Sequence, residues 1–122
     1  MRENVGLLAY SPLGFGFLTG KHLNGIAKNS RLDLFRNFVR YTNENCFKAT
    51  QLYKELAEKN GMTLTEMAMA FVNQQDFVTS TIIGATTMQQ LKENIAAFDV
   101  QLNEEVINEI DKIQELIPNP AP

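Results

Sequence analysis

Two short apolar runs and four longer amphipathic segments divide this chain. Residues 5–10, VGLLAY, are continuously apolar and are bounded by turn residues, which predicts a buried β-strand. Residues 78–84, VTSTIIG, are rich in β-branched side chains and predict a second strand that ends at Gly84. Both runs are short, as strands are, and helical patterns separate them.

Apolar side chains recur at helical spacing in the four amphipathic segments. Thr63 and Glu66 have the spacing of a capping box, and so do Thr87 and Gln90. Asn103 is expected to cap the last helix, whose first turn carries the acidic residues that the helix dipole favours. The predicted helices cover residues 43–60, 63–75, 86–98 and 103–116.

Glycines and prolines mark the breaks between these elements. Gly61 stands where a left-handed residue would end the first helix, and the prolines of the tail predict an extended C-terminus. Residues 11–41 hold four of the seven glycines and no long periodic segment. We expect a long loop there, with a short helical turn around RLDLFRNF, and loops of this length are usually functional or disordered.

The order of strand, loop, helix, helix, strand, helix, helix predicts parallel βα units, whose ligands bind at the carboxyl ends of the strands. After the first predicted strand come a Ser-Pro turn, glycines, Lys21 and, further on, Arg31. After the second come Gly84, Thr86 and the start of a helix, where backbone N–H groups favour an anion such as phosphate. Both strand ends therefore carry groups suited to a phosphate.

Composition excludes several classes of function. The chain has 122 residues and a net charge of −3, without a basic patch that would favour nucleic acid. Its apolar runs are too short to cross a bilayer, so no membrane role is expected, and the N-terminus lacks the layout of a signal peptide. Cys46 is the only cysteine, so an internal disulfide is impossible and a cytoplasmic location is expected.

The segments LLAYSPLGFGFLTGK and STIIGATTMQQLKENIAAFDVQL resemble the C-terminal part of the aldo-keto reductase family, in particular its bacterial Tas-like branch and its potassium-channel β-subunit-like reductases. The resemblance extends over essentially the whole chain, and the two motifs together are specific. It implies an α/β fold in which residues 1–122 form the C-terminal fragment of a (β/α)8 TIM barrel: about the last two βα units plus a C-terminal helix.

The resemblance also implies an NADP(H)-dependent reduction of aldehydes and ketones by hydride transfer. In this reading Tyr10 stacks on the nicotinamide ring, Lys21 and Arg31 neutralise cofactor phosphates, and backbone atoms of the Ser-Pro turn line the pyrophosphate. The turn residues with this role are Ser11, Pro12, Leu13, Gly14 and Phe15.

The second motif would hold the adenosine end of the cofactor. By resemblance, Gly84 and Thr86 meet the 2′-phosphate, while Glu93 and Asn94 hold the adenine edge. Gln90 stands where some relatives carry arginine, so the preference for NADPH over NADH is open at this position.

The family's catalytic tetrad of Asp, Tyr, Lys and His has no equivalent in this chain. Its members lie on strands that precede residue 1, and Tyr10, Lys21 and His22 do not correspond to them. A barrel of this type needs about 250 residues. We therefore expect a truncated reading frame, a split gene or a cut chain, which does not act on a small carbonyl substrate by itself. Such a chain would be marginally stable, aggregated or oligomeric, or would pair with a missing N-terminal half.

Each singled-out residue also has an ordinary structural interpretation. The Ser-Pro turn could simply end a strand, and Lys21 and Arg31 could be solvated surface charges. Helix capping alone would account for the threonines and Gln90, and an exposed helix face for Glu93 and Asn94. His22 has no second His or Cys at ligand spacing, so we expect a loop residue and no metal site, and Cys46 is expected to pack rather than react.

Three functions therefore remain open. The chain is the cofactor-binding part of a reductase, a non-enzymatic interaction module, or an inert remnant. We favour the first function, the cofactor-binding part of a reductase, because it accounts for both motifs.

Overall fold

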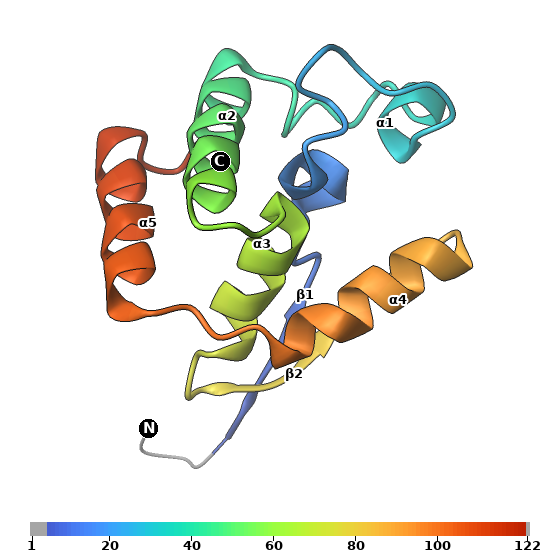
Figure 1. Cartoon of the computed structure of the whole chain (residues 1–122). Coiled ribbons are helices and arrows are strands. Elements are labelled where there is room, and N and C mark those ends of the chain that lie inside the picture. Colours follow the sequence, from blue (N-terminus) through green and yellow to red (C-terminus); the bar gives the residue numbers. More distant parts are fainter. Residues whose placement is uncertain (1–4, 122) are drawn as a thin grey trace.

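The computed structural model describes residues 5–121, in which two short strands and a set of helices follow the order predicted from the sequence (Figure 1). Each predicted helix is present within two or three residues of its expected bounds, and the expected helical turn near residue 31 is α1. The sequence did not predict η1, an irregular 3₁₀ segment in the long loop. The elements are β1 (Leu7–Tyr10), η1 (Gly14–Thr19), α1 (Arg31–Leu34), α2 (Glu44–Lys59), α3 (Leu64–Asn73), β2 (Val78–Ile82), α4 (Met88–Ala96), η2 (Ala97–Asp99) and α5 (Glu104–Leu116).

The two strands pair in parallel, as the alternation of strands and helices predicted. Tyr10 lies opposite Ile82, so the carboxyl ends of both strands meet at one edge of the sheet. Gly6 has no room for a side chain, because a Cβ there would collide with the side chain of Thr79. A glycine at this position therefore lets the chain enter β1 close beside β2.

Side-chain caps begin the longer helices, at the predicted Thr63, Thr87 and Asn103 and also at Asn43, which the sequence analysis did not single out. The side-chain oxygens of Asn43, Thr63, Thr87 and Asn103 each accept a hydrogen bond from a backbone N–H in the first turn of the helix that follows. The capping box is complete at Thr63, whose own N–H donates to Glu66 Oε2 over 2.7 Å. These caps satisfy backbone donors that a helix start otherwise leaves without a partner.

The main core lies between α2, α3 and α5. Leu56 and Ala57 of α2 pack against Leu64, Met67 and Ala70 of α3 and against residues of α5. The linker before α5 is fixed to the end of α3 by Gln74, whose side chain exchanges two hydrogen bonds with the backbone of Leu102, at 3.0 and 2.7 Å. Met67 of α3 is therefore a packing residue of this core.

A smaller core of Phe17, Leu32 and Cys46 lies under the long loop, and the C-terminal tail packs against it. The carbonyl of Pro120 accepts hydrogen bonds from Asn43 Nδ2 over 2.8 Å and from Cys46 Sγ over 2.9 Å. Burial raises the pKa of the Cys46 thiol, which keeps it protonated at neutral pH. Cys46 is therefore a packing residue and a hydrogen-bond donor, as expected.

The prediction that the first strand is buried is wrong for this chain. Leu8 is 59% exposed and Tyr10 76%, and Ile82 of β2 is also exposed. The physical reason is that α3 packs against this two-stranded sheet (Figure 1), while no further described strand or helix covers these side chains. Within residues 5–121 no helix is long and apolar enough to cross a membrane.

Candidate functional site: a dinucleotide-type edge of the sheet

The two sequence motifs meet at the carboxyl edge of the sheet. Because Tyr10 pairs with Ile82, the turn that begins at Ser11 and the segment that contains Gly84 leave neighbouring strands at the same edge. In Figure 1, η1 lies beyond the end of β1, and α4 follows β2 on the same side of the molecule. The fold therefore places both phosphate-suited segments together, as parallel pairing predicts.

The turn after β1 has an unusual backbone. Ser11, Gly14, Phe15 and Gly16 all have positive φ values, of 53°, 49°, 55° and 91°. Two hydrogen bonds close the turn, from Gly14 N–H to the Ser11 carbonyl and from Gly16 N–H to the Leu13 carbonyl. Positive φ is uncommon at serine and phenylalanine, and such strain gathers at ligand-binding sites.

Lys21 lies back across this turn. A Cβ placed on Gly16 would come within 2.5 Å of Lys21 Cε and 2.7 Å of its Nζ, so the lysine side chain lies across this glycine. The ammonium group is therefore beside the turn, while the Lys21 residue as a whole is exposed.

Arg31 reaches the same turn from α1. Its Cζ lies 5.3 Å from the centroid of the Phe15 ring, which is within the range of a cation–π contact. The rings of Phe38 and Tyr41 each lie 5.3 Å from Phe15 as well. The Phe15 side chain is therefore held among the long loop's own residues.

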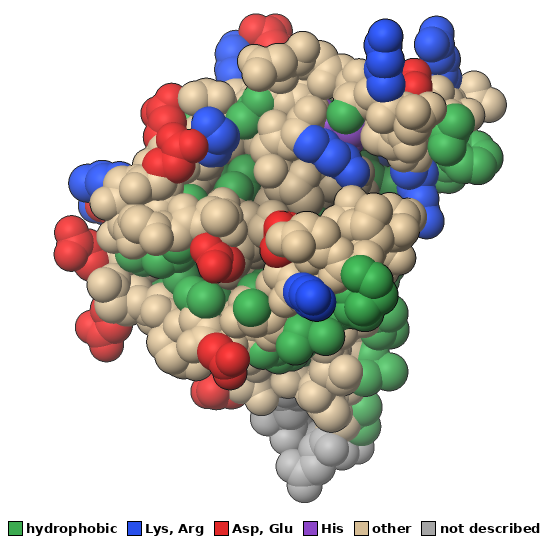
Figure 2. Space-filling view, turned by 45° about the vertical axis from the view of Figure 1, so that its right-hand side comes forward, with side chains coloured by type: hydrophobic (Ala, Val, Ile, Leu, Met, Phe, Trp, Pro, Cys, Tyr) green, Lys and Arg blue, Asp and Glu red, His purple; other side chains and the backbone are tan. Residues whose placement is uncertain are grey.

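The long loop is strongly basic although the whole chain is acidic. Residues 11–41 carry five basic side chains and a single acidic one, Asp33. Figure 2 shows lysine and arginine side chains gathered at the upper right of the molecule, and acidic ones mainly on its left. Asp33 is engaged with Arg36 and with the N–H of Asn29. A local excess of positive charge of this kind favours an anionic ligand.

The second motif is more open. No atom lies within 4 Å of where a Cβ on Gly84 would stand, so a ligand can approach the backbone there. Gln90 does not complete a capping box with Thr87, although its spacing predicted one. Its Oε1 accepts instead from the N–H and the hydroxyl of Thr86, at 2.9 and 3.0 Å. The donors of Thr86 are thus satisfied inside the chain.

Glu93 and Asn94 have different environments. Glu93 is exposed, and its Oε1 accepts a hydrogen bond from Gln89 over 2.8 Å. Asn94 is only 3% exposed. The alternative that both form an exposed helix face is therefore correct for Glu93 and wrong for Asn94, because α4 turns this amide towards the protein.

His22 is the residue of this region whose position the sequence analysis missed. His22, which was expected to be a loop residue, is fully buried beneath the turn, with 0% of the residue exposed. Its Nδ1 accepts a hydrogen bond from Ala27 N–H over 3.1 Å, and its ring lies 5.1 Å from that of Phe17. The one signal that the sequence offered is that His22, the only histidine of the chain, directly follows Lys21.

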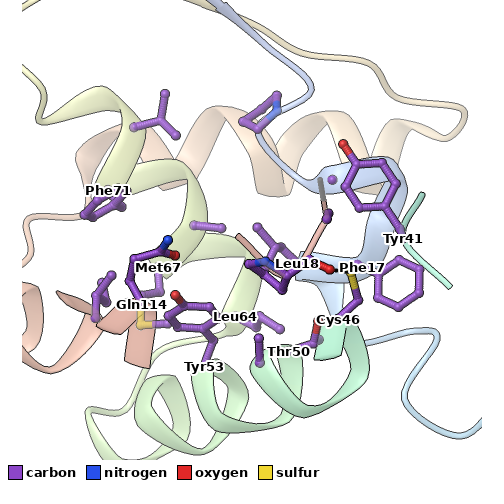
Figure 3. A pocket seen from close by; sticks show the side chains of 18 residues that line it. Phe17, Leu18, Tyr41, Cys46, Thr50, Tyr53, Leu64, Met67, Phe71 and Gln114 are labelled. Atoms are coloured by element: carbon purple, nitrogen blue, oxygen red, sulfur yellow. Dashed lines mark hydrogen bonds between the residues drawn. The ribbon is translucent and has the colours of Figure 1, made fainter. Parts of the chain in front are cut away.

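An apolar cavity of about 280 Å³ lies beside the turn (Figure 3). No lysine, arginine, histidine, aspartate or glutamate lines it, so it does not suit the charged part of a nucleotide. Pro12 and Gly14 border it from the turn, while α2, α3 and α5 supply most of its wall. Side chains labelled in Figure 3 include Phe17, Leu18, Cys46, Leu64, Met67 and Phe71.

The described residues contain no proton-donating group arranged for carbonyl chemistry. The tyrosines are Tyr10, Tyr41 and Tyr53, and none of them has a hydrogen bond to a lysine or histidine of residues 5–121. Burial, with Asp111 adding to it, raises the pKa of Tyr53, which is opposite to what a catalytic acid near neutral pH needs. In the same part of the chain, no group of three potential ligands could hold a metal ion.

The two parallel βα units form a portion of a (β/α)8 barrel. A sequence model of the Aldo/keto reductase family matches residues 1–115, and the chain belongs to this family. The fold class implied by the resemblance is thus confirmed.

The relatives are much longer than the chain. It is 48% identical over 121 residues to "Protein tas" of Escherichia coli (strain K12), covering 98% of this chain and 35% of that protein. It is 38% identical over 102 residues to the L-glyceraldehyde 3-phosphate reductase of the same strain, covering 80% and 30%. A glycerol dehydrogenase structure from Gluconobacter oxydans matches with a TM-score of 0.73 and 27% identity, covering 99% of this chain and 37% of that one. The chain therefore spans about a third of the length of these relatives.

Proposed function

We propose that this chain forms the nicotinamide-dinucleotide-binding part of an aldo/keto reductase that reduces aldehydes or ketones by hydride transfer. Family members work with NADH or NADPH, and the bound cofactor supplies the hydride. The observation that carries the proposal is the convergence of two cations, Lys21 and Arg31, on one strained turn at the carboxyl end of β1.

The first motif suits the diphosphate. We assign the strained backbone of residues 11–15 to the diphosphate, and the Lys21 ammonium beside Gly16 adds a full positive charge. Arg31, held over Phe15, adds a second charge. Tyr10, the last residue of β1, has an exposed ring that we assign to the nicotinamide.

The second motif supports NADP(H), and not only NAD(H), as the cofactor. Gly84 leaves open space, and the start of α4 offers the N–H groups of a helix terminus to a 2′-phosphate. Binding there requires the Gln90 amide to turn, so that its NH₂ rather than its oxygen faces the phosphate near Thr86. Glu93 is accessible to the adenine edge, whereas Asn94 reaches it only with the small exposed part of its amide.

The chain alone is proposed not to reduce carbonyls. Hydride transfer to a carbonyl needs a proton donor within hydrogen-bond reach of the oxygen, which contributes roughly 10²–10⁴-fold to the rate. The exposed Tyr10 is assigned to the nicotinamide, and Tyr53 lies away from the turn with a raised pKa. The proton donor and the pocket for a small carbonyl substrate therefore belong to further strands of a complete barrel.

The exposed faces of β1 and β2 support the proposal that further strands pack against this sheet. Parallel sheets are normally covered on both faces and paired at both edges. Leu7, Leu8 and Ile82 are exposed, and the longer relatives have the length to supply the remaining strands. We propose that further barrel strands, or failing these a second copy of the chain, cover this sheet.

The test of the cofactor assignment is a calorimetric titration of Lys21→Ala with NADPH and NADH, in this chain and in any longer natural form. Both cofactors carry the diphosphate, so loss of the charge-assisted contact of Lys21 is expected to weaken NADPH and NADH binding alike, by about 10- to 100-fold. Lys48→Ala is the matched control, because Lys48 is exposed on α2 and pairs with Glu44. Affinities equal to those of Lys48→Ala would overturn the dinucleotide site, and equal affinities of the wild type for NADPH and NADH would contradict the 2′-phosphate assignment.

The absence of turnover is tested separately with the purified 122-residue chain. With NADPH and a reactive aldehyde such as 4-nitrobenzaldehyde, no oxidation of NADPH is expected above the background without protein. Turnover that is lost in Tyr10→Phe would contradict this, since it would mean that Tyr10 donates the proton.

A further inference from the structure

The buried imidazole of His22 has a defined protonation pattern. Its Nδ1 accepts from the N–H of Ala27, so in the neutral ring the proton is on Nε2. The side chain is 0% exposed, so water cannot replace the hydrogen bond from Ala27. The Phe17 ring packs on the imidazole at 5.1 Å and helps to fix its plane.

The other nitrogen faces the turn that we assign to the diphosphate. A Cβ on Gly16 would stand 3.5 Å from His22 Nε2 and 2.7 Å from Lys21 Nζ, so the imidazole and the ammonium approach the same glycine. No well-aligned hydrogen bond joins Nε2 to another described residue, although the Phe15 carbonyl acts on the ring as an acceptor. A buried polar atom with an incomplete contact needs an explanation.

We propose that His22, in its neutral form, is the positioning residue of the dinucleotide-binding turn: it supports the backbone of residues 15 and 16, and with it Lys21, and it releases both when it takes up a proton. The proposal rests on the proposed function and adds a residue and a pH dependence to it. Nδ1 accepts a hydrogen bond only while it is unprotonated, so a proton there sets two donors, Nδ1–H and Ala27 N–H, against each other.

The groups around His22 act on its protonation in both directions. Burial is the main cause that lowers its pKa, the neighbouring Lys21 lowers it further, and the Phe15 backbone carbonyl raises it. Arg31 lies over Phe15, and Lys54 of α2 approaches Gly20 while it pairs with Glu58 over 2.8 Å. The loop's acidic residue, Asp33, is engaged with Arg36 and Asn29.

The direction of the pH effect follows. A histidine whose pKa is lowered in the folded chain is neutral at and above its ordinary value of about 6.5, so its support of the turn is fully present there. The support is lost as the pH falls through the lowered pKa of the folded chain. A bound diphosphate would pull in the other direction, because an anion favours the imidazolium, and the sign of the measured effect therefore distinguishes positioning from direct charge attraction.

The first experiment is imidazole NMR on the chain labelled with ¹⁵N-histidine. His22 is the only histidine, so its two nitrogen signals need no assignment by mutation. The Nε2–H tautomer is expected, with a pKa below 6.5, and both signals should move when NAD⁺ is added. The Nδ1–H tautomer, or a pKa above 6.5, would overturn the proposal.

The second experiment measures NAD⁺ affinity by calorimetry at about pH 7.5 and at a pH just below the His22 pKa that the NMR titration gives. NAD⁺ is used because it lacks the 2′-phosphate, which itself titrates near pH 6. Wild-type affinity is expected to fall about three- to tenfold on acidification. His22→Phe keeps the ring volume but not the acceptor, so its affinity should be lower by a similar factor at both pH values. His22→Asn can accept from Ala27 N–H without titrating, so it should recover most of the affinity and lose the pH dependence.

The outcomes separate the two proposals. Unchanged NAD⁺ affinity in His22→Phe, or a wild-type affinity that rises on acidification, would overturn the positioning role and leave the dinucleotide site intact. Absence of NAD⁺ binding by the wild type at both pH values would overturn the proposed function and the positioning role together. Lys48→Ala, which is remote from the turn, is expected to follow the wild type at both pH values.

Discussion

The helices α2, α3 and α5 bury their apolar side chains almost completely, whereas the strands β1 and β2 leave theirs largely exposed. Met67 of α3 is 2% exposed, while Leu8 of β1 is 59% exposed. A helix satisfies its backbone hydrogen bonds internally and needs neighbours only for one stripe of side chains. A parallel strand needs neighbours at both edges and on both faces.

This difference explains where stability and function are located. The helical core, with the Gln74–Leu102 hydrogen bonds, holds the chain together without further strands. The proposed site lies on the sheet side, where the strand ends are open. Binding residues are therefore supported by loops and by α3, and they depend more on what covers the sheet than the core does.

The largest expected effect is on the helical side. Met67→Ala creates a cavity in the main core and is expected to lower the free energy of unfolding by about 2–5 kcal/mol. Leu8→Ala, on the exposed face of the sheet, should change it by no more than about 0.5 kcal/mol. Urea unfolding followed by circular dichroism at low protein concentration compares the two variants. Equal losses would mean that the sheet contributes as much as the core.

An intermediate effect is expected on association. The exposed apolar residues of the sheet should make the chain self-associate, so that sedimentation velocity shows species larger than a monomer as the concentration rises. Leu8→Lys should shift this equilibrium towards monomer by placing a charge on the sheet. Leu116→Lys is the control, because Leu116 is exposed at the end of α5, on the helical side. A strictly monomeric wild type, or equal effects of the two lysines, would contradict the comparison.

The smallest expected effect is the difference in stability between helix-cap variants of the two regions. Thr63→Ala breaks a complete capping box and should cost about 1–2 kcal/mol of stability. Thr87→Ala should cost less, about 0.5–1 kcal/mol, because Gln90 still satisfies Thr86 at that helix start. Thermal unfolding of the two variants measures the difference. A larger loss at Thr87 would show that α4 is more firmly coupled to the core than its contacts indicate.

The sequence by itself determined the local elements and the motifs. Helical spacing with Thr63, Thr87 and Asn103 placed these helix starts, because caps act within a few residues of the helix that they begin. The left-handed Gly61 and the non-helical proline tail follow from backbone sterics in the same local way. The alternation of strands and helices was sufficient to predict parallel pairing, and with it the meeting of the two motifs at one edge.

Only the tertiary structure decided what depends on contacts between distant residues. An apolar run such as residues 5–10 predicts burial only if other strands cover it, and in this chain it is exposed. The packing of the tail on Asn43 and Cys46, more than seventy residues away in sequence, leaves no local pattern. His22 is buried beneath the turn because of positive φ values that residue types alone do not specify. In the same way, a side-chain rotamer decides that the Gln90 carboxamide oxygen accepts from Thr86 and not from Thr87.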